Sequence, residues 1–210
     1  MTLLSFADRI VVIHRSLEQA GIKHGFGGAI ALAYFVGEPR ATRDIDLNIN
    51  VATAEARMVL DALPVGVDIP DDAAELIGRD GQIRLWWDGG SGVPVDLFFP
   101  QHEFHREVAR EIHTVPFLET AIPIISSTHL VVFKCLYNRA RDWPDIDAML
   151  QAGTVDSASA LHWIARLLGD DSAAYRRLVA TLDRIAADEV DRSGSEMERP
   201  RVDWRTLGDR

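Results

Sequence analysis

One stretch, residues 27–46, constrains the fold of this chain more than any other part of its sequence. Two glycines open an Ala-rich helical segment, Ala29 to Phe35, and a turn then leads into a short apolar strand. That strand carries Asp44 and Asp46, whose side chains point to one face because strand residues alternate. The stretch therefore predicts a glycine turn, a helix and a strand with two carboxylates on the same face.

Paired carboxylates on a buried strand repel each other and are costly to remove from water unless a cation lies between them. Mg²⁺ suits oxygen-only ligands and is usually shared with a substrate phosphate. A glycine turn at a helix N-terminus exposes backbone N–H groups that hold phosphate. Asp44 and Asp46 are therefore candidate metal ligands, and Gly27 and Gly28 are a candidate phosphate site. The alternative for the two aspartates is an ordinary strand end.

Two apolar runs, Gln82 to Trp87 and Val93 to Phe99, flank the sequence DGGSG and predict a β-hairpin. Asp96 lies inside the second run, where a carboxylate without a partner is costly. A capped turn, or an ion pair with Arg84 across the hairpin, would explain it structurally.

The sequence becomes helical after about residue 120. Lys134 lies within the apolar run of one expected helix, where a lysine packs its stem along the core or reaches an anionic ligand. Asp142 and Asp145 follow in RDWPDIDAML, and a helix N-cap with first-turn charges is the structural explanation for them. Residues 189–210 lack periodicity and predict a loosely ordered tail.

The order Gly-Gly, helix, Arg-x-Thr-x-Asp-x-Asp-Leu resembles the nucleotidyltransferase superfamily built on the DNA polymerase β palm. It is most similar to the AbiEii-type branch, known for the toxin halves of bacterial toxin–antitoxin pairs. Lys134 followed by Arg-x-Arg-Asp-x-x-Asp-Ile resembles a second signature of that branch. The resemblance covers roughly residues 24–147. One departure is Gly28, because many members of the superfamily have serine at this position.

The resemblance implies an α+β fold with three parts. Residues 1–120 would form a nucleotidyltransferase palm, a mixed β-sheet with flanking helices. Residues 121–188 would form a C-terminal helical region, and residues 189–210 the loosely ordered tail.

The resemblance also implies the chemistry, which is transfer of a nucleotidyl group from an NTP to an acceptor hydroxyl with release of pyrophosphate. Two Mg²⁺ ions are expected, with Mn²⁺ as the alternative ion. The superfamily places a third metal carboxylate on a neighbouring strand, and this role falls to Asp96. The implied catalytic residues are Asp44, Asp46, Asp96 and Lys134, the first three also binding metal, and the implied nucleotide-binding residues are Gly27, Gly28, Arg40, Arg43, Lys134 and Asp142. Arg40 and Arg43 have an alternative role, which is simply to flank the strand.

Composition narrows the choice of partners. The formal net charge of −10 argues against broad electrostatic attraction to nucleic acid, although a local basic groove would still accept RNA. The resemblance implies an acceptor that is RNA such as tRNA, in a toxin that has an antitoxin partner, or a small hydroxylated molecule such as an aminoglycoside, and the acidic net charge fits a cationic antibiotic slightly better than RNA. A third hypothesis is a catalytically silent palm that binds a nucleotide or a protein. The single cysteine, Cys135, suits a reducing cytoplasm, and neither a membrane span nor a signal peptide is expected.

Overall fold

The computed structural model describes residues 4–38, 40–89 and 92–197, with side chains up to residue 190. The strands in these residues are β1 (His24–Phe26), β2 (Ile45–Ile49), β3 (Val67–Asp68), β4 (Gln82–Trp87), β5 (Val93–Phe98), β6 (His113–Phe117) and β7 (Thr120–Ile124). The helices in the same residues are α1 (Phe6–Gln19), α2 (Gly28–Leu32), the 3₁₀ turn η1 (Thr53–Glu55), α3 (Ala56–Asp61), α4 (Ala73–Asp80), α5 (Glu103–Arg110), α6 (Ser127–Tyr137), α7 (Asp142–Gln151), α8 (Ser157–Leu168) and α9 (Ala173–Met197).

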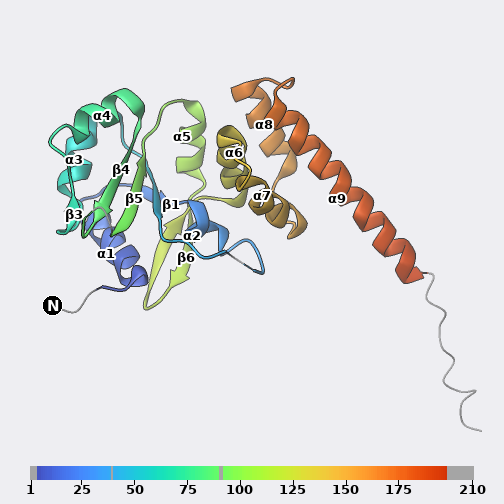
Figure 1. Cartoon of the computed structure of the whole chain (residues 1–210), viewed down its shortest axis with the longest axis horizontal. Coiled ribbons are helices and arrows are strands. Elements are labelled where there is room, and N and C mark those ends of the chain that lie inside the picture. Colours follow the sequence, from blue (N-terminus) through green and yellow to red (C-terminus); the bar gives the residue numbers. More distant parts are fainter. Residues whose placement is uncertain (1–3, 39, 90–91, 198–210) are drawn as a thin grey trace, which may run out of the picture.

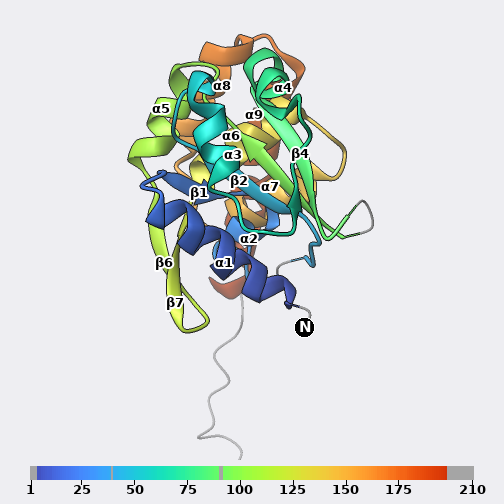
Figure 2. The ribbon, with the colours of Figure 1, turned by 90° about the vertical axis from the view of Figure 1, so that its left-hand side faces the viewer.

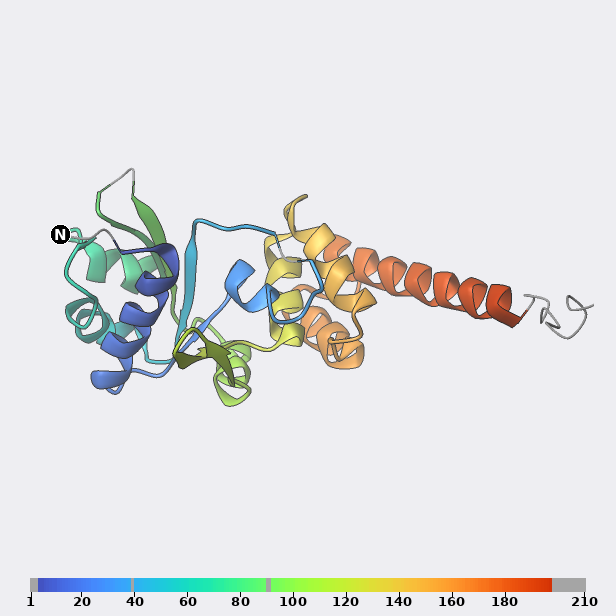
Figure 3. The same ribbon diagram turned by 90° about the horizontal axis from the view of Figure 1, so that it is seen from below.

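The described strands form one mixed sheet of seven strands in the order β3-β4-β5-β2-β1-β7-β6. At its centre β2 runs parallel to β5 and antiparallel to β1. Helices α1, α3 and α4 lie on one side of the sheet, and α2 with the C-terminal helices lies on the other (Figures 1 and 3). Figure 2 shows α1 and α3 in front of the sheet. The expected α+β architecture, a sheet followed by helices, is confirmed.

Helix α1 packs against the core and comes directly before β1 in the chain. A capping box between Ser5 and Asp8 begins α1, and Gly21 follows the helix with a φ of 70°, which favours glycine. Apolar residues at helical spacing, including Ile10, Ile13 and Leu17, are buried against the core. The chain then enters β1, which delivers the glycine turn to the centre of the sheet.

The expected hairpin is confirmed, because β4 and β5 pair antiparallel from Gln82↔Phe98 to Trp87↔Val93. A second hairpin joins β6 to β7. Helical structure was expected from about residue 120, and β7 corrects this, because residues 120–124 pair with β6 and extend the sheet. Pro123 lies opposite Thr114 of β6, and the pairing of β7 with β1 is at Ile124, so the proline is not part of the pairing with β1.

The C-terminal helices begin where Ser126 caps α6, its side chain accepting a hydrogen bond from the backbone N–H of His129. This helix carries Lys134 and the fully buried Cys135. The last helix, α9, extends away from the body of the molecule (Figures 1 and 3).

Helix α9 runs through Met197, so the expected start of a loose tail at residue 189 is wrong for 189–197. The segment carries little apolar periodicity, but the first proline after residue 188 is Pro200, so nothing in 189–197 breaks the helix as proline would. The remainder of the expected tail, 198–210, lies outside the described residues. Within the described parts of the chain, no helix is long and apolar enough to cross a membrane.

Candidate active site

A cavity of about 610 Å³ opens between the sheet and α6. Residues of β2, β4 and β5 line one side of it, and residues of α6 and the segment after α6 line the other. The sheet side carries the carboxylates of Asp46 and Asp96 together with Arg84, and the helix side carries Lys134, Arg139 and Arg141.

Three neighbouring strands place charged side chains in one row. Arg84 of β4 lies opposite Asp96 of β5, and Asp96 lies opposite Asp46 of β2. Side chains opposite one another on paired strands point to the same face, so this row faces the cavity, which all three residues line. The row continues to the glycine turn, because the backbone N–H of Gly27 donates to the carbonyl of Asp46 at 2.9 Å.

Asp46 is the carboxylate whose environment is least favourable to charge. Burial, followed by the neighbouring charges of Asp96 and Asp44, raises its pKa to about 6. Among the described residues no hydrogen-bond donor contacts its side chain. Asp46 is half-buried and lines the cavity, so without a donor from the protein its carboxylate is stabilised by water, by a cation or by protonation.

Gly28 makes room for this carboxylate. Its φ of 52° lies in the left-handed region, which favours glycine, and a Cβ there would lie 1.8 Å from Oδ2 of Asp46. This position therefore excludes a side chain for two separate reasons. The left-handed φ and the contact with Asp46 explain why this chain has glycine at residue 28, where many members of the superfamily have serine.

Asp96 has the partner that the sequence offered as its structural explanation. Arg84 donates to both of its carboxylate oxygens, from Nε at 2.8 Å and from Nη2 at 2.6 Å. The same Nη2 lies 3.6 Å from Oδ2 of Asp44, which sits just before β2. This bidentate pair raises the pKa of the Arg84 guanidinium, so that side chain stays cationic.

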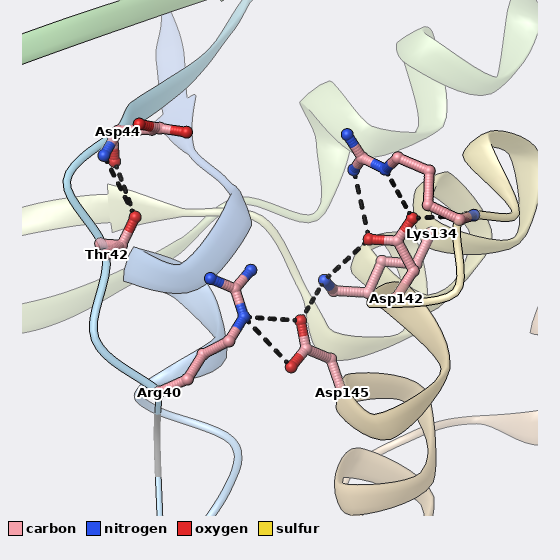
Figure 4. A network of polar contacts seen from close by, with 7 residues as sticks. Arg40, Thr42, Asp44, Lys134, Asp142 and Asp145 are labelled. Carbon is pink, nitrogen blue, oxygen red and sulfur yellow. Dashed lines mark hydrogen bonds and ion pairs between the residues drawn. The ribbon is translucent and has the colours of Figure 1, made fainter.

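On the helix side of the cavity, ion pairs link the charged side chains to one another (Figure 4). Lys134 is 4% exposed, and its Nζ donates to Asp145 at 2.5 Å and lies 3.7 Å from Asp142. Arg40 reaches Asp145 from the segment before β2, with Nε to Oδ2 at 3.1 Å. These contacts fix the position of the ammonium group on the cavity wall.

Asp142 is 1% exposed and does not line the cavity. Burial opposes its ionisation, but hydrogen bonds from Arg139 and the charge of Lys134 outweigh that effect and lower its pKa. Its position agrees with holding Lys134 in place rather than with contacting a nucleotide.

The cavity brings together most of the expected site residues, and it includes others that the sequence did not indicate. Six expected residues line it, namely Gly28, Arg40, Asp44, Asp46, Asp96 and Lys134. Gly27, Arg43 and Asp142 do not, and Arg43 is exposed. Tyr137, Arg139 and Arg141 also line it, and Asp145 holds Lys134. The spacing of Asp142 and Asp145 was the available signal for the last of these, since residues three apart share a helix face.

In the described part of the chain, the sheet side has the donor chemistry of a magnesium site but not a closed set of ligands. Among the described residues, no three acidic, histidine or cysteine side chains converge closely enough to enclose an ion. The donor set nevertheless fits Mg²⁺, because it consists of carboxylates and includes Asp46, which has no donor of its own. Metal binding by Asp96 would place the ion next to the positive charge of Arg84.

Comparisons with known proteins agree with this arrangement. Residues 13–210 match the family model described as the nucleotidyl transferase AbiEii toxin of a type IV toxin–antitoxin system. The comparison with curated proteins found no match.

Solved structures supply a fold comparison. An antigenic nucleotidyltransferase-like protein from Paracoccidioides brasiliensis has a TM-score of 0.52 at 15% identity, over 89% of this chain and 90% of that protein. The antibiotic-resistance factor ANT(2'')-Ia has a TM-score of 0.45 at 10% identity, over 92% and 97%. At these identities likeness supports the fold alone, and the first structure carries that argument. With the family match over most of its length, the chain belongs to the AbiEii family of nucleotidyltransferase toxins of type IV toxin–antitoxin systems.

Proposed function

We propose that this nucleotidyltransferase transfers a nucleoside monophosphate from an NTP to a hydroxyl of an RNA acceptor such as tRNA. The observation that carries the proposal is the pair Asp46 and Asp96, which lie side by side on parallel strands and face Lys134 across one cavity. In the reaction the acceptor oxygen bonds to the α-phosphorus. The bond from that phosphorus to the bridging oxygen breaks, and pyrophosphate leaves with the electron pair.

The carboxylates of Asp44, Asp46 and Asp96 would hold Mg²⁺, which neutralises triphosphate charge and lowers the pKa of the attacking hydroxyl. The family resemblance assigns removal of the hydroxyl proton to Asp96, which would have to loosen its pairing with Arg84 to act as a base. Mn²⁺ is the alternative ion, because it also accepts carboxylate ligands.

The remaining residues would bind the triphosphate. Lys134 and Arg40 present positive charge to the cavity, and both are positioned by Asp145. The N–H groups of Gly28 and Ala29 have no acceptor within α2, since the first turn of a helix leaves its donors unpaired. Gly27 itself donates to Asp46, so its part is to shape the turn.

The cations of the helix side favour RNA over a cationic drug as the acceptor. Lys134, Arg139 and Arg141 line the cavity although the whole chain carries a net charge of −10. Together with Arg40 these cations outnumber the two described carboxylates that pair with them, Asp142 and Asp145, and this excess of positive charge attracts a polyanion. Membership of a type IV toxin family supports the same choice and implies an antitoxin partner.

The test is incubation of the full chain with Mg²⁺, each α-labelled NTP and total tRNA, beside a separate aminoglycoside panel. Label on RNA that is lost in the Asp44→Ala/Asp46→Ala variant is the expected result. Label on the aminoglycosides would replace the RNA acceptor with a small molecule. No labelling of any acceptor, together with no NTP binding by calorimetry, would leave a silent palm and overturn the proposal.

A further inference from the structure

The row across the sheet ends in a cation that the proposed chemistry does not use. Arg84 engages both oxygens of Asp96, and its Nη2 approaches Asp44 as well. One guanidinium therefore contacts two of the three carboxylates assigned to metal. No described donor contacts the third, Asp46.

A divalent cation and Arg84 would compete for the same atoms. Metal ions bind the oxygens of an ionised carboxylate, and a bidentate guanidinium occupies both of those oxygens in its own plane. A metal ion between Asp46 and Asp96 would either share an oxygen of Asp96 with Arg84 or displace the guanidinium, and in both cases the two cations oppose each other.

The position of Arg84 allows its guanidinium to be displaced from Asp96. Its backbone is fixed in β4, whereas its side chain is 50% exposed and lines the cavity, so the guanidinium can leave Asp96 without losing its access to water. The side chain of Asp96, in contrast, is only 13% exposed and stays in the row. A cation that is partly hydrated is exchanged at lower cost than one that is buried.

We propose that Arg84 is a positioning residue that competes with the divalent cation for Asp96 and so sets the metal affinity of the site. This inference rests on the proposed function, since it takes the carboxylate row to be the metal site. Arg84 holds the carboxylates together without an ion, and it weakens the binding of the ion that replaces it. A purely structural ion pair would behave differently, because its removal would leave metal affinity unchanged or lower.

The experiment is calorimetric titration of MnCl₂ into the full-length protein and its Arg84→Ala variant. Manganese affinity is expected to rise about tenfold on removal of the guanidinium, which corresponds to one charge-assisted bidentate contact. Arg84→Lys should give a smaller rise, because lysine keeps the charge but not the bidentate geometry. Thermal melting should show a larger manganese-induced rise in Tm for Arg84→Ala than for the unmodified protein.

Arg166→Ala is the matched control. Arg166 makes a bidentate pair with Glu103 and is 52% exposed, but neither residue lines the cavity. Its removal should leave manganese affinity unchanged. Circular dichroism of each variant checks that the fold is retained, and Arg84→Gln replaces the alanine variant if that one does not fold.

The outcomes separate this inference from the proposed function. Manganese binding that is lost in Asp46→Asn but equal or weaker in Arg84→Ala would overturn the role of Arg84 alone. Manganese binding that persists in Asp46→Asn, or no binding by any form of the protein, would overturn the metal assignment and this inference together.

Discussion

The two sides of the cavity differ in how completely their charges are paired. On the helix side Lys134, Asp142 and Asp145 are all at most 6% exposed, and each has a partner of opposite charge. On the sheet side Asp46 has no described donor, and Asp96 shares Arg84 with Asp44. On the helix side every one of these buried charges is paired within the chain, whereas among the described residues of the sheet side the carboxylates outnumber the cations. Substitutions should therefore affect stability on the helix side and activity on the sheet side.

The largest expected effect is on activity. Asp96→Asn should lower nucleotidyl transfer on the order of a thousandfold, because the amide removes one charge from the metal ligands. Labelled-NTP transfer measures this loss, and urea unfolding should show little change because Arg84 is half exposed. Asp147→Asn, which alters an acid outside the cavity that pairs with Arg184, is the control. Activity within tenfold of the unmodified protein would contradict the role of the sheet side.

The next largest effect is on stability. Lys134→Met should lower the free energy of unfolding by about 3 kcal/mol, because it leaves buried Asp145 and Asp142 short of positive charge. Urea unfolding measures this loss. The double variant Lys134→Met/Asp145→Asn should lose less than the sum of the two single variants, since each removes the same pair. Additive losses would show that the two residues are not coupled.

A smaller effect, of opposite sign, is expected at Asp46. Asp46→Asn should stabilise the protein by on the order of 2 kcal/mol at pH 8 in EDTA. The native pKa of about 6 exceeds the ordinary value of 3.8, so the folded state is penalised for ionising this group. That penalty is full above about pH 6 and absent below about pH 4, so the stabilising effect should disappear as the pH falls. Urea unfolding at pH 4 and pH 8 measures it, and an equal gain at both values would refute this account.

The smallest effect separates two arginines of the same segment. Arg43→Ala should change transfer less than about twofold and stability by less than about 0.5 kcal/mol, since Arg43 is exposed and does not line the cavity. Arg40→Ala should raise the KM for NTP several-fold, because Arg40 lines the cavity beside Asp145. Steady-state kinetics of both variants compare them. If Arg43→Ala had the larger effect on transfer, Arg43 and not Arg40 would be the residue that binds the nucleotide.

The sheet side was largely predictable from the sequence because its determinants are local. Alternation placed Asp46 on one face of a strand, and the glycine-containing turn between the hairpin strands placed Asp96 within reach of Arg84. Which partner Asp96 takes depends on competing charges, so the sequence left both explanations open.

The helix side was less predictable because its contacts join distant segments. Arg40 and Asp145 are 105 residues apart in the chain, and no spacing rule links them. Asp142 looked like a ligand-binding residue, yet its burial beside Lys134 emerges only from the packing of α6 against α7. The missed strand β7 pairs locally with β6, but its attachment to the rest of the sheet is through β1, which lies about 100 residues earlier in the chain.

The one cysteine of the chain gives the helix side a built-in chemical reporter. Cys135 follows Lys134 directly, has no exposed surface, and has its thiol pKa raised to about 12 by burial and by the charge of Asp142. Thiol reagents attack the thiolate, so they should modify this residue only in molecules in which α6 has opened. The rate of its modification would then measure how often this wall of the cavity opens, and no additional cysteine would have to be introduced.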